Sequence, residues 1–421
     1  MKTFLRCAMF ISAIFLNASF CKAQSSKKSG SKSVTAKYIL GNPKYLAMSY
    51  GAYRELSQDI EPTITQLKED MKILAAMKIK LLRTYNVERI QVANVLEAIH
   101  QLKSEDSNFE MYVMLGAWID CKNARTDTPD HEAESEKNAG EIERAVALAK
   151  KYPGIVKIIA VGNEAMVKWA ASYYVQPGVI LKWVNHLQDL KKKNELSKDL
   201  WITSSDNFAS WGGGGNEYHV KDLEQLMKSV DFISMHTYPM HDTHYNPKFW
   251  GVMENEKKLS DIQKINACML RAKEYSVAQY ERVVKYMKSL KINKPIHIGE
   301  TGWASVSDGF YGATGSKATD EYKEGIYYRL MRDWTNKKGL SCFYFEAFDE
   351  QWKSANNPND SENHFGLIKL NGEVKYALWN LVDGGAFKGL TRNGKALIKS
   401  YAGNKKALLK EVLTPITIAK K

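Results

Sequence analysis

Between residues 45 and 383, a short apolar segment followed by a longer amphipathic one recurs eight times. The short segments are rich in Val, Ile and aromatic residues, which is typical of buried strands. They cover residues 45–50, 78–85, 109–117, 155–162, 199–204, 231–236, 294–299 and 341–347. Apolar residues recur at helical spacing in 61–77, 92–102, 142–152, 179–196, 220–230, 277–290, 322–336 and, in a short last helix, 376–383. Eight such units predict a parallel sheet that closes into a (β/α)8 TIM barrel of the α/β class.

The barrel is expected to form a single catalytic domain over residues 38–383, with segments of different composition on both sides. Residues 24–37 are rich in Ser and Lys and predict a flexible linker. Residues 384–421 form a basic C-terminal extension, which we expect to be dispensable for catalysis. A doubly wound open sheet is the structural alternative, but no GxGxxG motif follows the first strand to support it.

Residues 1–23 have the features of a secretory signal peptide. Basic residues Lys2 and Arg6 precede an apolar run that ends at Phe20, and a small residue, Ala23, stands at the expected cleavage point. The apolar run is shorter than the ~20 residues that span a bilayer. Anchoring as a lipoprotein through Cys21 is less favoured, because Phe20 stands where such signals need a small residue. The mature chain is therefore expected to be periplasmic or secreted, without stable membrane insertion.

The net charge of +13 does not describe the predicted barrel. Basic residues are concentrated in the two ends of the chain, and residues 38–383 have a net charge of −2. A nucleic-acid-binding surface would need basic residues clustered on the folded domain. The charge distribution therefore gives no support for nucleic-acid binding, and a neutral partner remains possible.

Three cysteines, Cys121, Cys268 and Cys342, remain once the signal peptide is removed. An odd number permits at most one intramolecular disulfide. They have no CxxC spacing and no paired histidines, so they do not predict a zinc site. We expect neither a metal nor a cofactor.

Two glutamates stand at the ends of predicted strands. Glu164 follows the strand at 155–162, and Glu300 follows the strand at 294–299. Active sites of (β/α)8 barrels lie at this end of the strands. One such Glu alone is as readily explained by a surface position or an ion pair. Two of them, in Asn-Glu and Glu-Thr-Gly-Trp contexts, indicate a glycosidase, in which one carboxyl group protonates the leaving oxygen and the other attacks the anomeric carbon or activates water.

Four motifs make the chain resemble glycoside hydrolase family 17, within the clan of retaining (β/α)8 glycosidases. They are VGNE at 161–164, GETGWAS at 299–305, FEAFDEQWK at 345–353 and HFGLI at 364–368. The resemblance covers about residues 44–383 and is closer to microbial than to plant members. Members of the family are β-1,3-glucanases, licheninases and β-1,3-glucan transglycosylases. One departure is Ala304, where many members have Pro.

The resemblance implies a retaining hydrolase that cleaves β-1,3-glucosidic bonds in a laminarin-type β-glucan by double displacement. It implies that Glu164 is the acid/base and Glu300 the nucleophile. Asn163 would bind the 2-hydroxyl of the reacting sugar, Tyr238 would hold the nucleophile, and Tyr85 would line the site. A nucleophile must stay ionised, which a hydrogen bond from Tyr238 would favour.

The resemblance also implies a charged network around the cleft, formed by Glu350, Lys353 and Glu362. For Glu350 and Lys353 a purely structural ion pair is the alternative. Arg83 is a further candidate for supporting Glu300, and His236 is a candidate to line the substrate site. The sequence contains no HExxH motif that would make His236 part of a metal site.

Tryptophans are candidates to stack on the apolar faces of sugar rings. Trp303 and Trp352 are favoured because they adjoin the two carboxyl-terminal motifs; Trp118, Trp169, Trp211 and Trp250 also fall in predicted loops or strand ends. Packing in the core is the alternative for each of them.

Two other functions remain open. A β-1,3-glucan transglycosylase would use the same two glutamates with a sugar acceptor in place of water. A non-catalytic glucan-binding protein is disfavoured because both carboxylates are present. Endo or exo action depends on loops such as the insertion at residues 239–276, and the protein is expected to act as a monomer on a polysaccharide or oligosaccharide.

Overall fold

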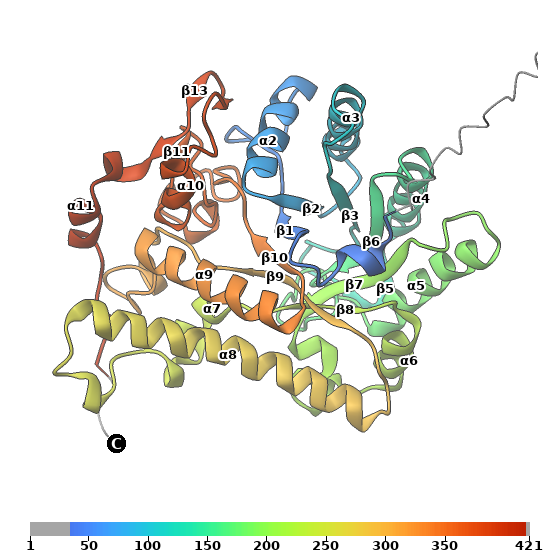
Figure 1. Ribbon diagram of the computed structural model, residues 1–421. Helices are drawn as coiled ribbons and strands as arrows, with labels where there is room; N and C mark the ends of the chain where they lie inside the picture. Colours follow the sequence, from blue (N-terminus) through green and yellow to red (C-terminus); the bar gives the residue numbers. More distant parts are fainter. Residues whose placement is uncertain (1–33, 418–421) are drawn as a thin grey trace, which may run out of the picture. The chain divides into compact units, whose positions relative to one another are not determined.

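The computed structural model describes residues 34–417, so the predicted signal peptide and most of the predicted linker lie outside the described residues. Eight parallel strands close into a barrel in the order β1, β2, β3, β6, β7, β8, β9, β10 (Figure 1). They are β1 Leu46–Ser49, β2 Ile79–Arg83, β3 Tyr112–Ala117, β6 Val156–Asn163, β7 Trp201–Asn207, β8 Ile233–His236, β9 Ile296–Gly302 and β10 Cys342–Phe345. Each overlaps a predicted strand, and the predicted (β/α)8 fold is confirmed.

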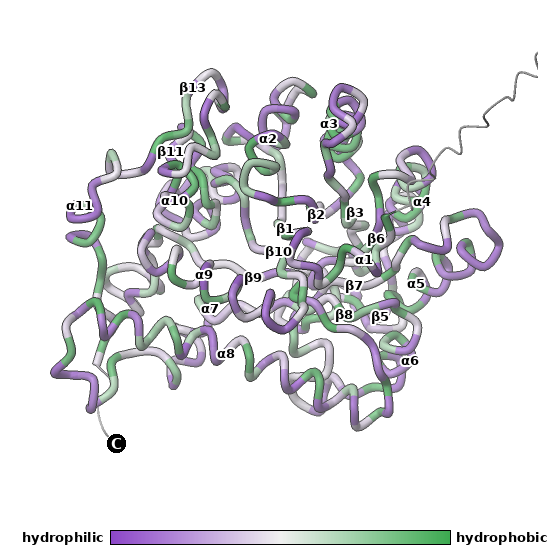
Figure 2. The backbone as a smooth tube through the Cα atoms, viewed as in Figure 1, coloured by the Kyte–Doolittle hydropathy of each residue, from purple (hydrophilic) through white to green (hydrophobic). Residues whose placement is uncertain are grey.

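Helices follow the strands and cover the outside of the barrel (Figure 1). They are α2 Ile64–Ala76, α3 Ile90–Glu105, α4 Lys137–Lys151, α5 Pro177–Lys192, α6 Lys221–Ser229, α8 Asp261–Ser289, α9 Glu321–Lys338 and, after β10, η7 Tyr376–Leu378 with α10 Trp379–Asp383. Hydrophobic and hydrophilic residues alternate along α8, as expected for a helix with one face on the barrel (Figure 2).

Helix α8 is much longer than the helix predicted at 277–290. The prediction was wrong about where this helix begins. A capping box formed by Ser260 and Gln263 starts it, satisfying backbone N–H groups that the first turn leaves unpaired. Buried residues Ile265 and Met269 then continue the apolar face toward its N-terminus.

Short helix α1, Ala36–Ile39, lies against the amino-terminal ends of the strands. Its buried residues Ala36 and Ile39 join one apolar cluster with inward-facing residues of the barrel, among them Leu81, Met114 and Phe343. Helix α1 therefore takes in the last two residues of the predicted linker.

The loops at the carboxyl ends of the strands contain most of the additional structure. They hold the hairpin β4 Cys121–Lys122 and β5 Asp130–Glu134, the helix α7 Pro239–Tyr245, and the short helical turns η1 Ala209–Gly213, η2 Asn216–Tyr218, η3 Pro247–Phe249, η4 Glu254–Glu256, η5 Gly309–Tyr311 and η6 Ser361–Asn363. These loops form the walls of the site described below.

The C-terminal extension is folded onto the barrel as far as it is described. It consists of β12 Thr391–Arg392, β13 Lys395–Ala396, β14 Ile398–Lys399, η8 Ser400–Gly403 and α11 Lys405–Lys410, and β14 pairs with β11 Glu373–Val374. Arg392 and Leu408 are buried, and Thr417 pairs with Val252 of the insertion before α8. The extension is basic, but Arg392 and the apolar residues Phe387, Leu397 and Leu408 pack inward.

Cys121, Cys268 and Cys342 are buried and unpaired. From Val34 to Thr417, no helix combines the length and the apolar character needed to cross a membrane.

Candidate active site

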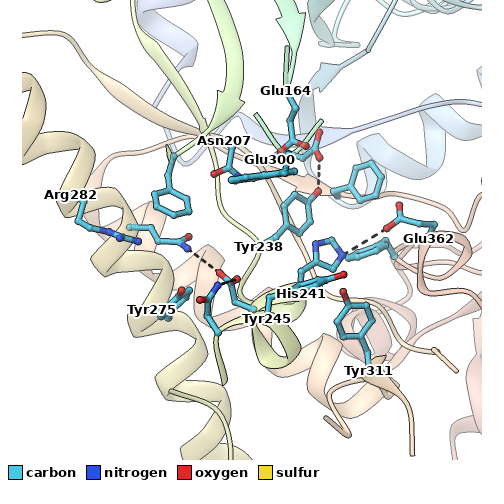
Figure 3. Close-up of a pocket in the computed structure, with 17 residues that line it drawn as sticks. Glu164, Asn207, Tyr238, His241, Tyr245, Tyr275, Arg282, Glu300, Tyr311 and Glu362 are labelled. Carbon is cyan, nitrogen blue, oxygen red and sulfur yellow. Dashed lines mark hydrogen bonds and ion pairs between the residues drawn. The ribbon is translucent and has the colours of Figure 1, made fainter. Parts of the chain in front are cut away.

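Glu164 and Glu300 lie at the carboxyl ends of the strands and line one cavity of about 810 Å³ (Figure 3). Glu164 directly follows β6, and its backbone N–H donates a 3.0 Å hydrogen bond to the carbonyl oxygen of Ser205 on β7. Glu300 belongs to β9 and is paired in register with His236 of β8. The fold thus brings together two residues that are 136 positions apart in the sequence.

The backbone of Glu164 has a φ of +47°, a left-handed conformation that is uncommon and costly for residues other than glycine. Asp206 holds the chain just beyond it. One oxygen of its buried carboxylate accepts a 2.7 Å hydrogen bond from the N–H of Met166, and the other accepts a 2.6 Å bond from the Ser210 hydroxyl. Burial, the main cause, raises the pKa of Asp206 to about 6.

The sequence reading missed Asp206. The available signal was an acidic residue two positions after the predicted strand at 199–204, where a barrel places its site residues.

Glu300 is surrounded by groups that favour its charged form. Arg83 pairs with its Oε2, and the hydroxyl of Tyr238 donates a 2.6 Å hydrogen bond to its Oε1. Burial alone would raise the pKa of Glu300. Positive charge on His236 and Arg83, together with the hydrogen bonds, outweighs burial and lowers this pKa to about 2. Glu300 is therefore a carboxylate over the whole ordinary pH range.

Arg83 links Glu300 to the residue that precedes Glu164. Besides Glu300, its guanidinium donates a 2.5 Å hydrogen bond to Oδ1 of Asn163, the residue before Glu164. The guanidinium also lies 4.7 Å from the centre of the Tyr85 ring. Three predicted site residues, Asn163, Tyr85 and Glu300, are thus held by one fully buried arginine.

His236 does not line the cavity, contrary to its predicted role. Its side chain is fully buried, with Nδ1 3.1 Å from Oε1 of Glu164 and Nε2 2.7 Å from the hydroxyl of Ser205. The imidazole is therefore enclosed between Ser205 and the carboxyl group of Glu164. His236 therefore positions Glu164.

Two of the three residues of the predicted charged network, Glu350 and Lys353, lie together, and Glu346 joins them. Nζ of Lys353 lies 2.7 Å from Glu346 and 3.3 Å from Glu350. Burial and the charge of Glu350 raise the pKa of Glu346 well above its usual range. Burial opposes the charge of Lys353, but the surrounding carboxylates outweigh it and raise its pKa. Glu362 lies apart, 3.8 Å from His241.

Some of the candidate tryptophans are buried in the core. Trp303 is one of them, so its predicted role in sugar binding was wrong. Its side chain is fully buried, its indole N–H donates a 2.8 Å hydrogen bond to the carbonyl of Ala318, and its ring packs on Trp250 and Tyr327. Such a ring is part of the core and cannot stack on a sugar. Trp211 is buried in the same way.

Two adjoining hollows lie on either side of Glu300. The larger, which we name the Trp169 hollow, has the volume of about 810 Å³ given above. The smaller, the Trp352 hollow, has a volume of about 260 Å³. Both contain Glu300, Phe345 and Glu362.

Each hollow has its own set of lining residues. The Trp169 hollow is lined also by Glu164, Asn207, Phe208, Tyr238, His241, Tyr245, Tyr275, Arg282 and Tyr311. The Trp352 hollow is lined also by Tyr53, Tyr85, Trp118, Asn163, Glu350 and Lys353. The two hollows share Glu300, and aromatic side chains line both. We refer to them together as the cleft.

Within residues 34–417, no group of three or more His, Cys, Asp or Glu side chains is arranged to hold a metal ion.

Comparison with solved structures reveals a near relative. The crystal structure of an endo-laminarinase from Formosa Hel1_33_131 is 66% identical in sequence, with a TM-score of 0.91 over 92% of this chain and 99% of that one. A glycoside hydrolase family 17 β-1,3-glucanosyltransferase from Rhizomucor miehei has a TM-score of 0.55 over 79% of this chain and 96% of that chain, at 18% identity. At that identity the second likeness shows the fold alone.

Curated relatives are more distant. A probable glucan endo-1,3-beta-glucosidase, btgC, of Aspergillus flavus is 24% identical over 340 residues, and its namesake in Aspergillus fumigatus is 23% identical over 329 residues. These alignments cover 78% and 76% of this chain, which spans only 42% and 40% of the length of those relatives.

The model of one protein family matches residues 47–366, from the first strand of the barrel to the loop after the last. That range includes both glutamates, Arg83, Asn163, Tyr238 and the lysine network. The chain belongs to the family of BtgE/BtgC glycoside hydrolase domains.

Proposed function

We propose that this protein is a retaining glycoside hydrolase of family 17 that cleaves β-1,3-glucosidic bonds in β-glucan. The proposal rests on two glutamates that lie in one cleft but have different surroundings. Glu300 is kept ionised by Arg83 and Tyr238. Glu164, by comparison, has a quarter of its side chain exposed to the cavity and an imidazole behind it.

Glu300 is the nucleophile in this proposal. One of its carboxylate oxygens attacks the anomeric carbon and forms a covalent bond to it, while the bond from that carbon to the leaving oxygen breaks. Arg83 and Tyr238 keep the carboxylate ionised before the attack. They also fix its orientation, which lowers the entropic cost of reaching the transition state.

Glu164 is the acid/base. It gives its proton to the leaving oxygen as the glycosidic bond breaks, and the second sugar departs as an alcohol. A water molecule then attacks the anomeric carbon and returns a proton to Glu164, and Glu300 is released as a carboxylate. His236 and Asp206 support this role by holding the Glu164 side chain and the turn that carries it.

The linings of the two hollows indicate how a bound glucan is oriented in the cleft. Glu164 lines the Trp169 hollow and is absent from the lining of the Trp352 hollow, whereas Asn163 and Tyr85 line only the latter. The acid must face the leaving sugar, and the amide that would bind the 2-hydroxyl must face the reacting sugar. The reacting end of the glucan therefore occupies the Trp352 hollow, and the leaving end occupies the Trp169 hollow.

The choice of β-1,3-glucan is supported by the relatives. The structure at 66% identity is an endo-laminarinase, and the curated relatives are probable glucan endo-1,3-beta-glucosidases. Transglycosylation, which would use the same two glutamates with a sugar acceptor in place of water, remains the alternative. A neutral polymer also suits a barrel whose residues 38–383 have a net charge near zero.

We further propose that the enzyme acts outside the cytoplasm, after cleavage following Ala23. The support is the sequence of residues 1–23, with its basic start and short apolar run. A polymeric glucan outside the cell cannot diffuse across a membrane, which agrees with export of the enzyme.

Incubation of the purified protein with laminarin, followed by proton NMR, tests the proposal. The first reducing ends formed should be the β anomer. Glu300→Ala should lower the rate by several orders of magnitude, whereas the control Glu281→Ala, on the exposed side of α8, should leave it within about twofold. A first-formed α anomer, or a Glu300→Ala rate above about a tenth of wild type, would overturn the assignment.

A further inference from the structure

An exposed aromatic cluster lies at the outer end of the Trp169 hollow. It consists of His244 and Tyr245, at the end of α7, and Phe310, in η5. Tyr245 is 63% exposed and Phe310 is 55% exposed. We name these three residues the aromatic ledge. Large aromatic side chains that gather on a surface commonly mark a binding site, because single exposed rings are ordinary but clusters are not.

The ledge is an organised structure. The rings of His244 and Phe310 are stacked, with centroids 4.1 Å apart and planes at 16°. The ring of Tyr245 lies 4.8 Å from His244 and 6.3 Å from Phe310. The loops that follow β8 and β9 thus contribute to one surface, although the residues are more than 60 positions apart.

The two loops are joined beneath the ledge, so it has a fixed place on the barrel. The hydroxyls of Thr243 and Ser316, both buried, are 2.8 Å apart. The indole N–H of the buried Trp250 donates a 2.8 Å hydrogen bond to the carbonyl of Ser316. A ligand that binds this surface would not have to order two mobile loops, which is a major cost of association.

The ledge continues the cleft. Tyr245 lines the same cavity as Glu164 and Glu300, and so does Tyr311, the neighbour of Phe310. Figure 3 shows the two glutamates at one end of that cavity and Tyr245 and Tyr311 at the other. A polymer whose leaving end fills the Trp169 hollow would therefore pass over Tyr245 and Phe310 as it leaves the protein.

We propose that the aromatic ledge is a distal binding site for the leaving side of a long, neutral β-glucan chain. This inference rests on the proposed function. The apolar C–H faces of pyranose rings would lie on Tyr245 and Phe310, and the ring nitrogens of His244 and the hydroxyl of Tyr245 would meet sugar hydroxyls. The site engages only those substrates that are long enough to extend beyond the hollow, and it thereby makes the enzyme prefer polymer to short oligosaccharides.

The test compares substrates of different length. Values of kcat/KM are measured for linear β-1,3-gluco-oligosaccharides of increasing size and for an unbranched β-1,3-glucan. In the double variant Tyr245→Ala, Phe310→Ala, the ratio of the polymer value to the trisaccharide value should fall about fivefold or more. The control is Tyr38→Ala, which removes a ring of similar exposure, 57%, from α1 at the other end of the barrel, and it should keep the wild-type ratio.

Binding measured without turnover provides a second readout. In a Glu300→Ala background, calorimetric titration with the same oligosaccharides should show affinity that rises with chain length. In the ledge variants, affinity should no longer increase for the oligosaccharides that are long enough to reach the ledge. An unchanged length dependence in both experiments would overturn the proposal, and so would a ledge variant whose only change is its oligomeric state in sedimentation, since that would make the ledge a contact between copies of the chain.

Failure of this inference differs from failure of the proposed function. If the wild type cleaves no β-1,3-glucan, the proposed function is wrong and no kcat/KM values can be compared. If the wild type prefers polymer and the double variant prefers it equally, the function stands and the ledge is not a binding site.

Discussion

Arg392 of the C-terminal extension donates a 2.9 Å hydrogen bond from Nε to Oδ1 of Asp70 on α2, and both side chains are fully buried. Asp70 also accepts a 2.8 Å bond from Tyr50, which follows β1 and lines the Trp352 hollow. The guanidinium of Arg392 lies 4.0 Å from the centre of the Phe348 ring. The extension thus supports one wall of the cleft.

We therefore expect the C-terminal extension to be needed for a stable barrel. Arg392→Met should lower the free energy of unfolding by about 2–4 kcal/mol, because Asp70 loses one of its two arginine partners while remaining buried. Chemical denaturation measures this. The matched control is Arg89→Met, whose ion pair with Asp59 is exposed and should contribute little. Equal stability of wild type and Arg392→Met would show that the extension is only loosely associated.

Tyr238→Phe should move the acidic limb of the pH profile. The pKa of Glu300, about 2 in the wild type, is held down in part by the Tyr238 hydroxyl. Its removal favours the protonated form, so activity should be lost at a higher pH, by roughly half to one unit in kcat/KM. Tyr327→Phe, which removes a buried hydroxyl bonded to Thr301 instead, should leave the limb where it was. A limb that moves equally in both variants would contradict the assignment.

Glu164→Ala should separate the two steps of the reaction. Natural glucans need a proton on the leaving oxygen and should react far more slowly, whereas activated aryl glycosides should form the covalent intermediate with little loss. The intermediate should then accumulate, because the same residue activates water. Azide should relieve this block and give a β-glycosyl azide, detected by NMR. An α product, or equal losses on both substrates, would reverse the roles of the two glutamates.

Asp206→Asn should impair the acid/base step through its backbone contact. The two oxygens of the Asp206 carboxylate accept hydrogen bonds from the backbone N–H groups of Met166 and Asn207. Asn keeps only one accepting oxygen, so the support of the turn at Glu164 should weaken. We expect about a 10–100-fold loss on laminarin and a much smaller loss on an activated aryl glycoside. The control is Asp231→Asn, whose carboxylate likewise accepts a backbone N–H, that of Ile202, at the start of β7. Equal losses on the two substrates would mean that Asp206 acts on stability alone.

Trp303→Ala and Trp352→Ala should have opposite consequences. The first empties a fully buried site and should cost about 3–5 kcal/mol of folding free energy. The second removes a ring that lines the Trp352 hollow, so it should raise KM for laminarin several-fold with little effect on stability. Denaturation curves and steady-state kinetics on both variants distinguish core from cleft. A free energy of unfolding equal to that of wild type in Trp303→Ala would contradict the place of Trp303 in the core.

The eight strands and the two glutamates could be predicted because they depend on local signals. A buried parallel strand is a short apolar run of β-branched and aromatic residues, whatever surrounds it. Glu164 and Glu300 follow such runs directly, so the barrel geometry alone brings them to one face. The beginning of α8 was missed because its apolar residues, such as Ile265 and Met269, are separated by many polar ones.

The roles of individual side chains required the tertiary structure. Trp303 and Trp352 look alike in sequence, since each adjoins a motif. One is buried because the carbonyl of Ala318 and the ring of Trp250 surround it, and neither is near it in the local pattern. His236 ends a strand that points to the site, yet its side chain is fully buried between Glu164 and Ser205.

The sequence by itself determined the barrel, its two carboxylates and the motif residues around them, because periodicity and strand ends are properties of short segments. Only the tertiary structure decided that Asp206 holds the turn of Glu164, that the basic extension inserts Arg392 beside Asp70, and that an aromatic ledge continues the cleft. Arg392 and Asp70 are 322 residues apart. Which distant side chains meet depends on how whole loops pack, and that is set by the free energy of the complete fold rather than by any local pattern.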